Sequence, residues 1–274
     1  MEGRILTIAG SDSGGGAGIQ ADIKTITALG GYASSVITAL TAQDTVAVHE
    51  VQAVDPFFVE TQLRTVLQDI GADAIKIGML HSRTTAELVA RELERAARHT
   101  PLVLDPVMAA SSGTALLESS GVEVIRRRLL PMCALITPNL QEAQALTRRT
   151  VEDEGDMHAA ADQLLLAGAN AVLITGGHLE GDSLVDLLRT ADGDEVRFEH
   201  ERQATRATHG TGCTLSSAVA AGLGQGLTLR DAVTQAIDFV QDAMRCATQI
   251  GNGETGPLDH AFALRTRPKE SRLH

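Results

Sequence analysis

The sequence of 274 residues is poor in aromatic residues and in cysteine. Five Phe, one Tyr and no Trp are too few to build the stacking platforms that hold single-stranded nucleic acid. The three cysteines, Cys133, Cys213 and Cys246, lie far apart, and no pair has metal-ligand spacing. We therefore expect neither a disulfide scaffold nor a zinc knuckle. No apolar run approaches the roughly 18 residues that cross a bilayer, so no membrane partner is expected.

Basic residues are also in deficit. Lys and Arg number 23 against 35 Asp and Glu, which gives a net charge of −12 and argues against nucleic acid or an anionic membrane as the main partner. The first nine residues have neither the basic region nor the apolar core of a signal peptide, so we expect a cytoplasmic protein. Because no Pro/Ser-rich linker interrupts the chain, we expect one domain over 1–274. Its last residues, 265–274, are expected to be a frayed tail.

Glycine, in contrast, is abundant and clustered. Four of the 26 glycines fall within residues 14–18, which favours a turn whose backbone approaches a ligand, although a tight strand-to-helix turn is the alternative. A second cluster, Gly210-Thr211-Gly212-Cys213, leads into a helix of small residues. Free N–H groups at such a helix start form an anion site, commonly for phosphate, and their field is expected to lower the Cys213 pKa. The alternative is a packed helix with Cys213 as a small core residue.

Strand-like and helix-like segments alternate along the chain, which predicts an α/β fold. We expect a doubly wound, mostly parallel sheet with helices on both faces, whose polar breaks gather at one edge. The expected strands are 4–9, 33–42, 46–54, 74–77, 102–104, 134–136, 171–174, 184–189 and 195–200. The expected helices are 19–29, 56–70, 84–98, 122–130, 140–146, 158–167, one from 211 and one from 229 to 250.

Several common nucleotide and hydrolase motifs are absent or out of place. The 10–18 cluster has no lysine before a hydroxyl residue, so it is not a P-loop. A literal G-x-G-x-x-G occurs at Gly251, Gly253 and Gly256, but it follows a helix and precedes Pro257. That context is wrong for a dinucleotide site, although the loop could edge a pocket. No G-x-S-x-G elbow is present, so acyl hydrolysis has little support.

Two carboxylates follow neighbouring predicted strands. Asp105 precedes Pro106, and Glu142 lies just after Thr137-Pro138-Asn139. Such a pair could position hydrated Mg²⁺ against phosphates. The alternative is a helix cap at Asp105 and a solvated helix carboxylate at Glu142.

A set of short motifs, taken together, resembles the ribokinase-like kinases. Within that group the chain is similar to the hydroxymethylpyrimidine/phosphomethylpyrimidine kinases of thiamine biosynthesis. The motifs occur in the family's order over nearly the whole chain, so the set is far more specific than any member of it. The matching segments are Gly10–Asp22, Thr41–Thr45, Lys76–Leu80, Asp105–Met108, Thr137–Ala143, Gly176–His178, His209–Ser216 and Gly256–His260.

The resemblance implies a ribokinase-like fold and an activity. The activity is ATP- and Mg²⁺-dependent phosphorylation of 4-amino-5-hydroxymethyl-2-methylpyrimidine and of its monophosphate, by a chain that pairs into homodimers. The implied catalytic residues are Gly210, Thr211, Gly212 and Cys213. The implied pyrimidine-binding residues are Gly10, Asp22, Gln43, Met79, Val107 and His209. Asn139, Thr175 and Gly177 are implied for nucleotide or phosphate, and Asp105 and Glu142 for magnesium.

Two positions depart from the family pattern. Ser111 and Thr175 stand where the family usually has lysine, so two positive charges near the expected phosphate path are missing. Two further hypotheses therefore stay open. One is a pyridoxal or pyridoxine kinase, and the other is a nucleotide or pyrimidine-phosphate binding protein without catalysis.

Overall fold

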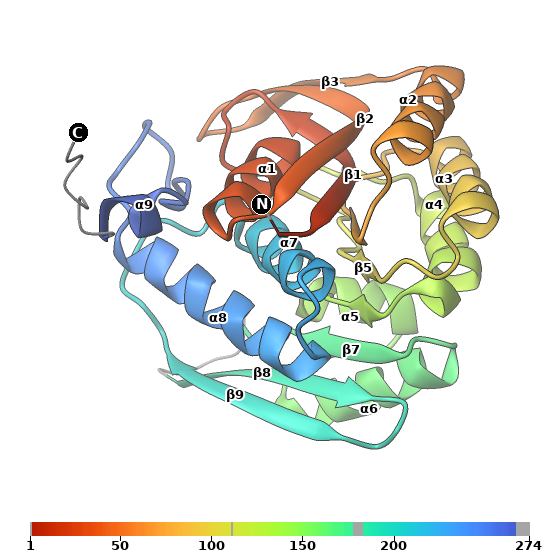
Figure 1. The fold of residues 1–274 in the computed structure, drawn as a ribbon. Coiled ribbons are helices and arrows are strands. Elements are labelled where there is room, and N and C mark those ends of the chain that lie inside the picture. The colour runs from red at the N-terminus through yellow and green to blue at the C-terminus, as the bar shows by residue number, and fades with distance from the viewer. Residues whose placement is uncertain (1, 111, 178–182, 267–274) are drawn as a thin grey trace, which may run out of the picture.

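The computed structural model describes residues 2–110, 112–177 and 183–266. Ser111, His178 and the end of the expected tail, 267–274, lie outside the described residues. The described chain folds around a nine-stranded sheet in the order β3-β2-β1-β4-β5-β6-β7-β8-β9 (Figure 1). The strands are β1 (Arg4–Asp12), β2 (Tyr32–Gln43), β3 (Val48–Ala53), β4 (Ala74–Ile77), β5 (Leu102–Leu104), β6 (Leu135–Ile136), β7 (Ala171–Ile174), β8 (Ser183–Thr190) and β9 (Glu195–Glu201).

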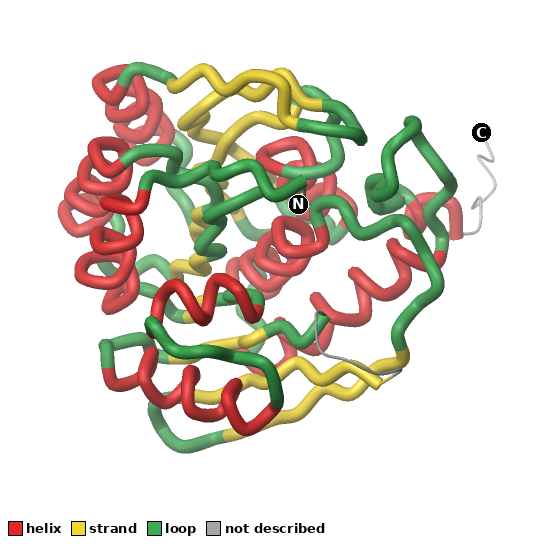
Figure 2. The backbone as a smooth tube through the Cα atoms, turned by 180° about the vertical axis from the view of Figure 1, so that it is seen from behind, coloured by secondary structure: helices red, strands yellow, loops and turns green. Residues whose placement is uncertain are grey.

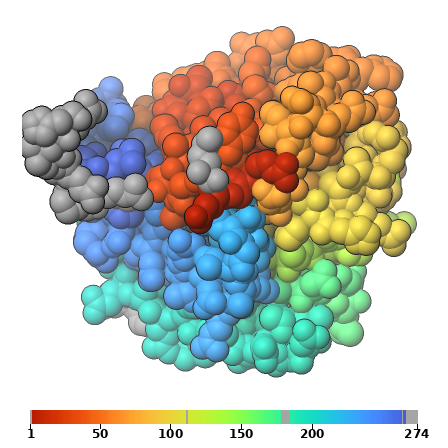
Figure 3. Space-filling view, viewed as in Figure 1, coloured from red at the N-terminus to blue at the C-terminus, as the bar shows by residue number. Residues whose placement is uncertain are grey.

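The sheet is mostly parallel, as predicted. Strands β2, β1, β4, β5, β6 and β7 run parallel to their neighbours, whereas β3 and the β8–β9 hairpin are antiparallel additions at the two edges. The hairpin turns at Gly193, as its sequence predicts. It forms the lower border of the face drawn in Figure 3.

Helices cover both faces of the sheet, and the strand sequences explain why. The helices are α1 (Gly18–Ala28), α2 (Pro56–Asp69), α3 (Arg83–Ala96), α4 (Ser119–Val124), α5 (Leu140–Thr147), α6 (Glu154–Leu166), α7 (Thr211–Gly224), α8 (Leu229–Arg245) and α9 (Phe262–Thr266). Successive strand side chains point to opposite faces. Ile5 is buried with α1, α7 and α8, and Leu6 is buried with α2 to α6. Figures 1 and 2 show these two layers from opposite sides.

Some expected boundaries were wrong. Strand β1 continues past Gly10 to Asp12, because its end pairs with β2. Helix α6 begins at Glu154 instead of His158, because the Asp153 side chain caps it. The expected helix over 122–130 is α4, a π-helical turn (Ile125–Leu129) and a 3₁₀ turn (Leu130–Met132). Helix α8 ends at Arg245, five residues early, and the short α9 was not expected.

The strand order places a crevice at the carboxyl edge of the sheet. From β1 the chain passes to β2 on one side, and it later returns to β4 on the other side of β1. Ligands of open α/β sheets bind at such a reversal point. The predicted gathering of polar breaks at this edge is confirmed, since Asp12, Gly78, Asp105, Asn139 and Thr175 all lie at or just after the carboxyl ends of parallel strands.

Candidate active site

The start of α7 joins the two glycine clusters. Gly210 precedes the helix with a φ of +86°, in the left-handed region that favours glycine. A Cβ atom at Gly210 would overlap the carbonyl oxygen of Gly16. Any side chain at position 210 would therefore push the two turns apart. The sequence spacing predicted the start of α7 correctly, at Thr211.

Two backbone N–H groups at this helix start are free to bind an anion. The Thr214 N–H donates to the Gly210 carbonyl oxygen at 2.9 Å. Among the residues that the structure describes, the N–H groups of Gly212 and Cys213 have no acceptor. Gly212 is exposed, and a Cβ atom there would lie 3.8 and 3.9 Å from the Asp105 carboxylate oxygens. This anion hole, defined by the N–H groups of Gly212 and Cys213, therefore opens beside Asp105.

The thiol of Cys213 does not have the lowered pKa that the helix field predicts. Burial raises the pKa of the Cys213 thiol to about 12, and the Lys76 ammonium offsets only part of this effect. The Asp105 and Asp22 carboxylates raise the Cys213 pKa further. Burial and nearby negative charge thus outweigh the helix N-terminus, and Cys213 is a neutral thiol at pH 7.

Asp105 and Glu142 form a buried acidic pair. Burial raises the pKa of Asp105, and burial followed by the Asp105 charge raises the pKa of Glu142 to about 8. Glu142 also completes a capping box at α5, where it accepts the Asn139 N–H at 2.9 Å and donates its own N–H to Asn139 Oδ1 at 2.9 Å. The alternative of a solvated carboxylate at Glu142 is therefore wrong, and the cap found at this edge belongs to Asn139.

The acidic pair fits magnesium only if phosphates and water complete the coordination. No group of three or more His, Cys, Asp or Glu side chains able to hold a metal occurs within the described ranges 2–110, 112–177 and 183–266. Magnesium commonly binds through one or two carboxylates together with water and substrate phosphates. Two buried carboxylates that disfavour each other's charge suit a divalent cation in that arrangement.

Asp22 does not reach the open crevice. Its side chain is fully buried and accepts hydrogen bonds from Lys76 Nζ at 2.9 Å, from Ser217 Oγ at 2.7 Å, and from Thr7 Oγ1. Both carboxylate oxygens are thus occupied by protein donors. The direct pyrimidine contact expected for Asp22 conflicts with this burial, and Asp22 is a structural anchor between β1, β4, α1 and α7.

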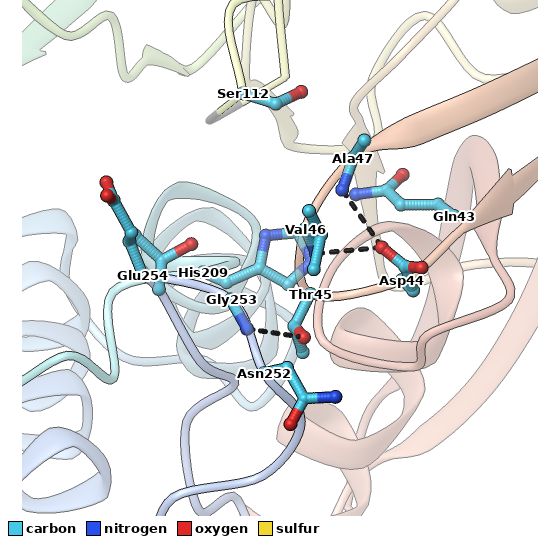
Figure 4. Close-up of a pocket in the computed structure, with 11 residues that line it drawn as sticks. Gln43, Asp44, Thr45, Val46, Ala47, Ser112, His209, Asn252, Gly253 and Glu254 are labelled. Atoms are coloured by element: carbon cyan, nitrogen blue, oxygen red, sulfur yellow. Dashed lines mark hydrogen bonds between the residues drawn. The ribbon is translucent and has the colours of Figure 1, made fainter.

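Gln43 and His209 line one pocket. It has a volume of about 470 Å³ and is bordered by residues 43–47, by His209 and by residues 252–255, with Ser112 opposite (Figure 4). Gln43 ends strand β2, and His209 directly precedes Gly210, the N-cap of α7. The segments are joined by a hydrogen bond of 3.1 Å from the Gly253 N–H to Thr45 Oγ1. The misplaced G-x-G-x-x-G motif therefore edges a pocket, as the sequence left open.

Asp12 organises the first glycine cluster from inside. Its carboxylate accepts N–H groups from Gly14, Gly16 and Ala17 and lies 3.0 Å from His209 Nε2. Burial opposes ionisation, but the hydrogen bonds from His209 and the backbone outweigh it and lower the pKa of Asp12. This carboxylate thus holds the turn and His209 together and is not free for a ligand.

Gly10, Met79 and Val107 come together beside the crevice. A Cβ atom at Gly10 would lie 2.7 Å from Met79 Sδ, so glycine leaves room for the methionine. Met79 is buried with Ala39 and Leu116, and Val107 packs against this cluster. Neither Met79 nor Val107 lines the pocket of Figure 4, so their contact with the pyrimidine stays a prediction.

The expected nucleotide residues lie after strands β6 and β7, beyond Asp105 at the end of β5. Asn139 and Thr175 form a parallel bridge between the ends of β6 and β7. The Asn139 Oδ1 atom is occupied as the α5 cap. Gly177 is exposed, and its carbonyl oxygen accepts a hydrogen bond from Arg202 at 3.2 Å. These three residues are therefore near one another and away from Gln43 and His209.

Sequence reasoning gave no role to Lys76, Ser216 and Ser217. All three are fully buried, and they bind the two aspartates below α7. One signal was available, because a lysine stands in the apolar strand Ala74–Ile77. A charged residue in a strand buried on both faces requires a partner of opposite charge.

Comparison with known proteins agrees with this geometry. The family model described as phosphomethylpyrimidine kinase matches residues 12–259. A hydroxymethylpyrimidine/phosphomethylpyrimidine kinase of Streptomyces coelicolor is 48% identical over 261 residues, which cover 95% of each chain. A thiamine biosynthesis bifunctional protein of Geobacter sulfurreducens is 47% identical over 95% of this chain, which spans only 53% of that protein.

Among solved structures, the ADP complex of Bacillus subtilis pyridoxal kinase has a TM-score of 0.89. It is 36% identical and covers 97% of this chain and 100% of its own. The fold is therefore ribokinase-like, as the sequence predicted, and the enzyme is a kinase. The family match over residues 12–259, together with the motifs assembled at the carboxyl edge of the sheet, shows that the chain belongs to the phosphomethylpyrimidine kinase family.

Proposed function

We propose that this protein transfers the γ-phosphoryl group of ATP to 4-amino-5-hydroxymethyl-2-methylpyrimidine, and then to its monophosphate, in thiamine biosynthesis. The observation that carries the proposal is the anion hole: two unpaired N–H groups at the start of α7, beside a buried carboxylate, in a chain of this kinase family. Phosphoryl transfer depends mainly on positioning and on offsetting charge. Free backbone donors at a helix start supply both without reorganisation.

In this proposal the position of each site residue along the sheet edge determines whether it binds the pyrimidine, the phosphoryl group or the nucleotide. Gln43 and His209 line the pocket that takes the pyrimidine, with Gly10, Met79 and Val107 packed beside it. Gly210 and Thr211 shape the turn, and the Gly212 and Cys213 N–H groups face the phosphoryl group. Asn139, Thr175 and Gly177 border the nucleotide. Asp22 orients the site from below and does not touch the ring.

Asp105 and Glu142 are the residues that would hold Mg²⁺. When bound with ATP, the ion neutralises phosphate charge. The chain's own part is to present two carboxylates at the ends of β5 and β6 and to keep them buried beside the anion hole. Because Thr175 replaces the family lysine, the chain relies more on these groups and on the backbone to hold phosphates.

Cys213 remains our candidate for the residue that contacts the hydroxyl group of the pyrimidine as it attacks the γ-phosphorus. Cys213 lies in the first turn of α7, and its N–H group belongs to the anion hole. Since the thiol is neutral before substrate binds, Cys213 adds no negative charge to the phosphate path. A protonated thiol cannot take up the hydroxyl proton, so a part in proton transfer would require Cys213 to lose its own proton once the substrate is bound, and substitution of Cys213 measures that part.

Pyridoxal is the second candidate substrate. The solved pyridoxal kinase of B. subtilis shares the fold closely, with a TM-score of 0.89. The lower identity to that kinase, 36% against 48% for the pyrimidine kinase of S. coelicolor, favours the pyrimidine. The hypothesis of a protein that binds nucleotide without catalysis is set aside, because the chain belongs to a kinase family.

A single-turnover experiment separates catalysis from binding. Excess protein is mixed with γ-labelled ATP, magnesium chloride and the hydroxymethylpyrimidine, and the reaction is quenched over time. We expect labelled pyrimidine monophosphate, followed by the diphosphate when ATP is in excess. Binding of ATP in calorimetry without any labelled product would reject the kinase proposal, and monophosphate alone would reject the second phosphorylation.

We also propose that the chain acts as a single domain and pairs into homodimers. Phe57 and Phe58, adjacent at the start of α2, are 78% and 59% exposed, and exposed apolar side chains of this size favour association. Light scattering should give twice the mass of 28.8 kDa. Calorimetry should give one cooperative unfolding transition, and a monomer or two separate transitions would contradict the proposal.

A further inference from the structure

A fully buried lysine lies below the anion hole. Lys76 Nζ is 2.9 and 3.0 Å from the two Asp22 carboxylate oxygens and 4.0 Å from Asp105 Oδ2. None of its side chain is exposed. Gly78, two residues on, leaves room for the ammonium, because a Cβ atom there would lie 2.7 Å from Lys76 Nζ.

The two carboxylates around Lys76 belong to different parts of the site. Asp22 is held by Thr7 and Ser217, inside the protein. Asp105 accepts a hydrogen bond of 3.2 Å from Ser216 and lies next to Gly212 of the anion hole. Adjacent buried serines on α7 thus hold one carboxylate each, and Lys76 lies between these carboxylates.

The positive charge of Lys76 affects the anion hole as well as the stability of the fold. An ionised Asp105 beside the anion hole repels an incoming phosphate, and Asp22 adds to this negative potential. One ammonium cancels one of the two negative charges, and at this depth charges interact strongly over several ångströms. Without Lys76, the negative charges of Asp105, beside the anion hole, and of Asp22, below it, would both go uncompensated.

Building on the proposed function, we propose that Lys76 is a positioning residue for phosphoryl transfer. Its ammonium group, anchored by Asp22, fixes the Asp105 carboxylate beside the anion hole and offsets its charge. A purely structural role would instead end at the Asp22–Lys76 ion pair, and the two roles make different predictions once Asp22 is neutral.

The test removes the lysine in a background where its structural partner is already uncharged. Asp22→Asn is compared with Asp22→Asn/Lys76→Met, and both are checked for cooperative melting. Replacing a buried ion pair with neutral residues of similar size commonly preserves stability. If the Met variant does not melt cooperatively, Lys76→Gln takes its place, because its amide can hydrogen-bond the amide at position 22.

We expect the double variant to have a kcat roughly 10- to 100-fold below that of Asp22→Asn, with a nearly unchanged KM for the pyrimidine. Its affinity for AMP-PCP with magnesium chloride, measured by calorimetry, should also fall. Equal kcat and equal AMP-PCP affinity in the two proteins would overturn the proposal.

The nucleotide measurement keeps this inference separate from the proposed function. If the wild type transfers no phosphate to the pyrimidine, the proposed substrate fails. A loss of AMP-PCP affinity on removing Lys76 would still support its role at the phosphate site, and unchanged affinity would contradict it.

Discussion

At the scale of single residues, the chemistry of the site depends on how buried charges balance. Cys213, Asp105, Asp22 and Lys76 form one group below the start of α7. Burial alone would lower the pKa of Lys76, but the surrounding acidic groups raise it, so the lysine stays charged. The same surroundings keep Cys213 protonated, and burial near Asp105 also raises the pKa of Glu142.

The first prediction concerns the reactivity of Cys213. Only thiolate reacts readily with alkylating agents, so Cys213, with a pKa of about 12, should react far more slowly at pH 8 than the exposed Cys246. Peptide mass spectrometry after iodoacetamide treatment measures both sites in one sample. Equal modification of the two cysteines would contradict the raised pKa.

Substitution of Cys213 tests its part in catalysis. If Cys213 takes part in proton transfer, Cys213→Ala should lower kcat by roughly 10²–10⁴-fold and leave pyrimidine and nucleotide binding nearly intact. Cys246→Ala is the matched control and should keep wild-type kcat. Wild-type turnover in Cys213→Ala would make this residue a packing residue only.

The second prediction concerns Glu142 and stability at rising pH. Its folded pKa of about 8 lies above its ordinary value of 4.5, so the folded protein holds a proton that the unfolded chain releases. Stability should therefore fall between about pH 4.5 and pH 8, by at most about 1.4 kcal/mol per pH unit. The melting midpoint of the ligand-free protein should drop from pH 6 to pH 8.

Glu142→Gln should flatten this dependence, because the amide has no proton to lose in this range. Exposed Glu50→Gln is the control and should keep the wild-type slope. An unchanged slope in Glu142→Gln would show that another group causes the pH dependence.

At the scale of elements, two segments from opposite ends of the chain close the pocket, and one of them, 251–256, is rich in glycine. The turn over 43–47 and the loop over 251–256 are joined at Thr45. A Cβ atom at Gly253 would overlap the Thr45 carbonyl oxygen, and one at Gly251 would overlap its hydroxyl group. The glycines of this motif are therefore explained by close packing against Thr45.

Gly253→Ala should displace this loop from the pocket and lower kcat/KM for the pyrimidine by roughly 10- to 100-fold. Gly256→Ala is the matched control from the same loop. Its Cβ atom would meet only the Ile250 carbonyl oxygen at 3.7 Å, and it should keep wild-type kinetics. Equal effects of the two substitutions would contradict the contact with Thr45.

Sequence patterns located the elements better than their ends and partners. The start of α7 was predicted because two glycines and a run of small residues mark it. The end of β1 was not, because Gly10 and Ser11 are poor strand formers and are held there only by pairing with β2. The contact of Gly210 with Gly16 joins residues nearly 200 positions apart, which no local pattern reveals.

The candidate site residues show the same contrast between local sequence patterns and contacts between distant residues. Gly212, Asp105 and Gln43 were found because each follows a strand or begins a helix. The burial of Asp22 and the role of Lys76 were missed, because both depend on four elements meeting below the surface.

At the scale of the whole molecule, the fold places the proposed site residues along the carboxyl edge of the sheet. Six parallel strands end there, and the direction of the chain connections reverses at β1, which lies between β2 and β4. The pocket at the end of β2, the anion hole at the start of α7 and the acidic pair after β5 and β6 lie along this edge. The mostly parallel sheet could be predicted because its strands read as short apolar runs. The antiparallel partner of β2 could not be distinguished from another parallel strand.

The most direct test of the central claim is a comparison of substrates. The kcat/KM values of the wild type are measured with ATP and magnesium chloride for the hydroxymethylpyrimidine and for pyridoxal under the same conditions. We predict phosphorylation of both or of the pyrimidine alone, with the higher kcat/KM for the pyrimidine. A higher value for pyridoxal, or no phosphate transfer to the pyrimidine, would contradict the proposed function.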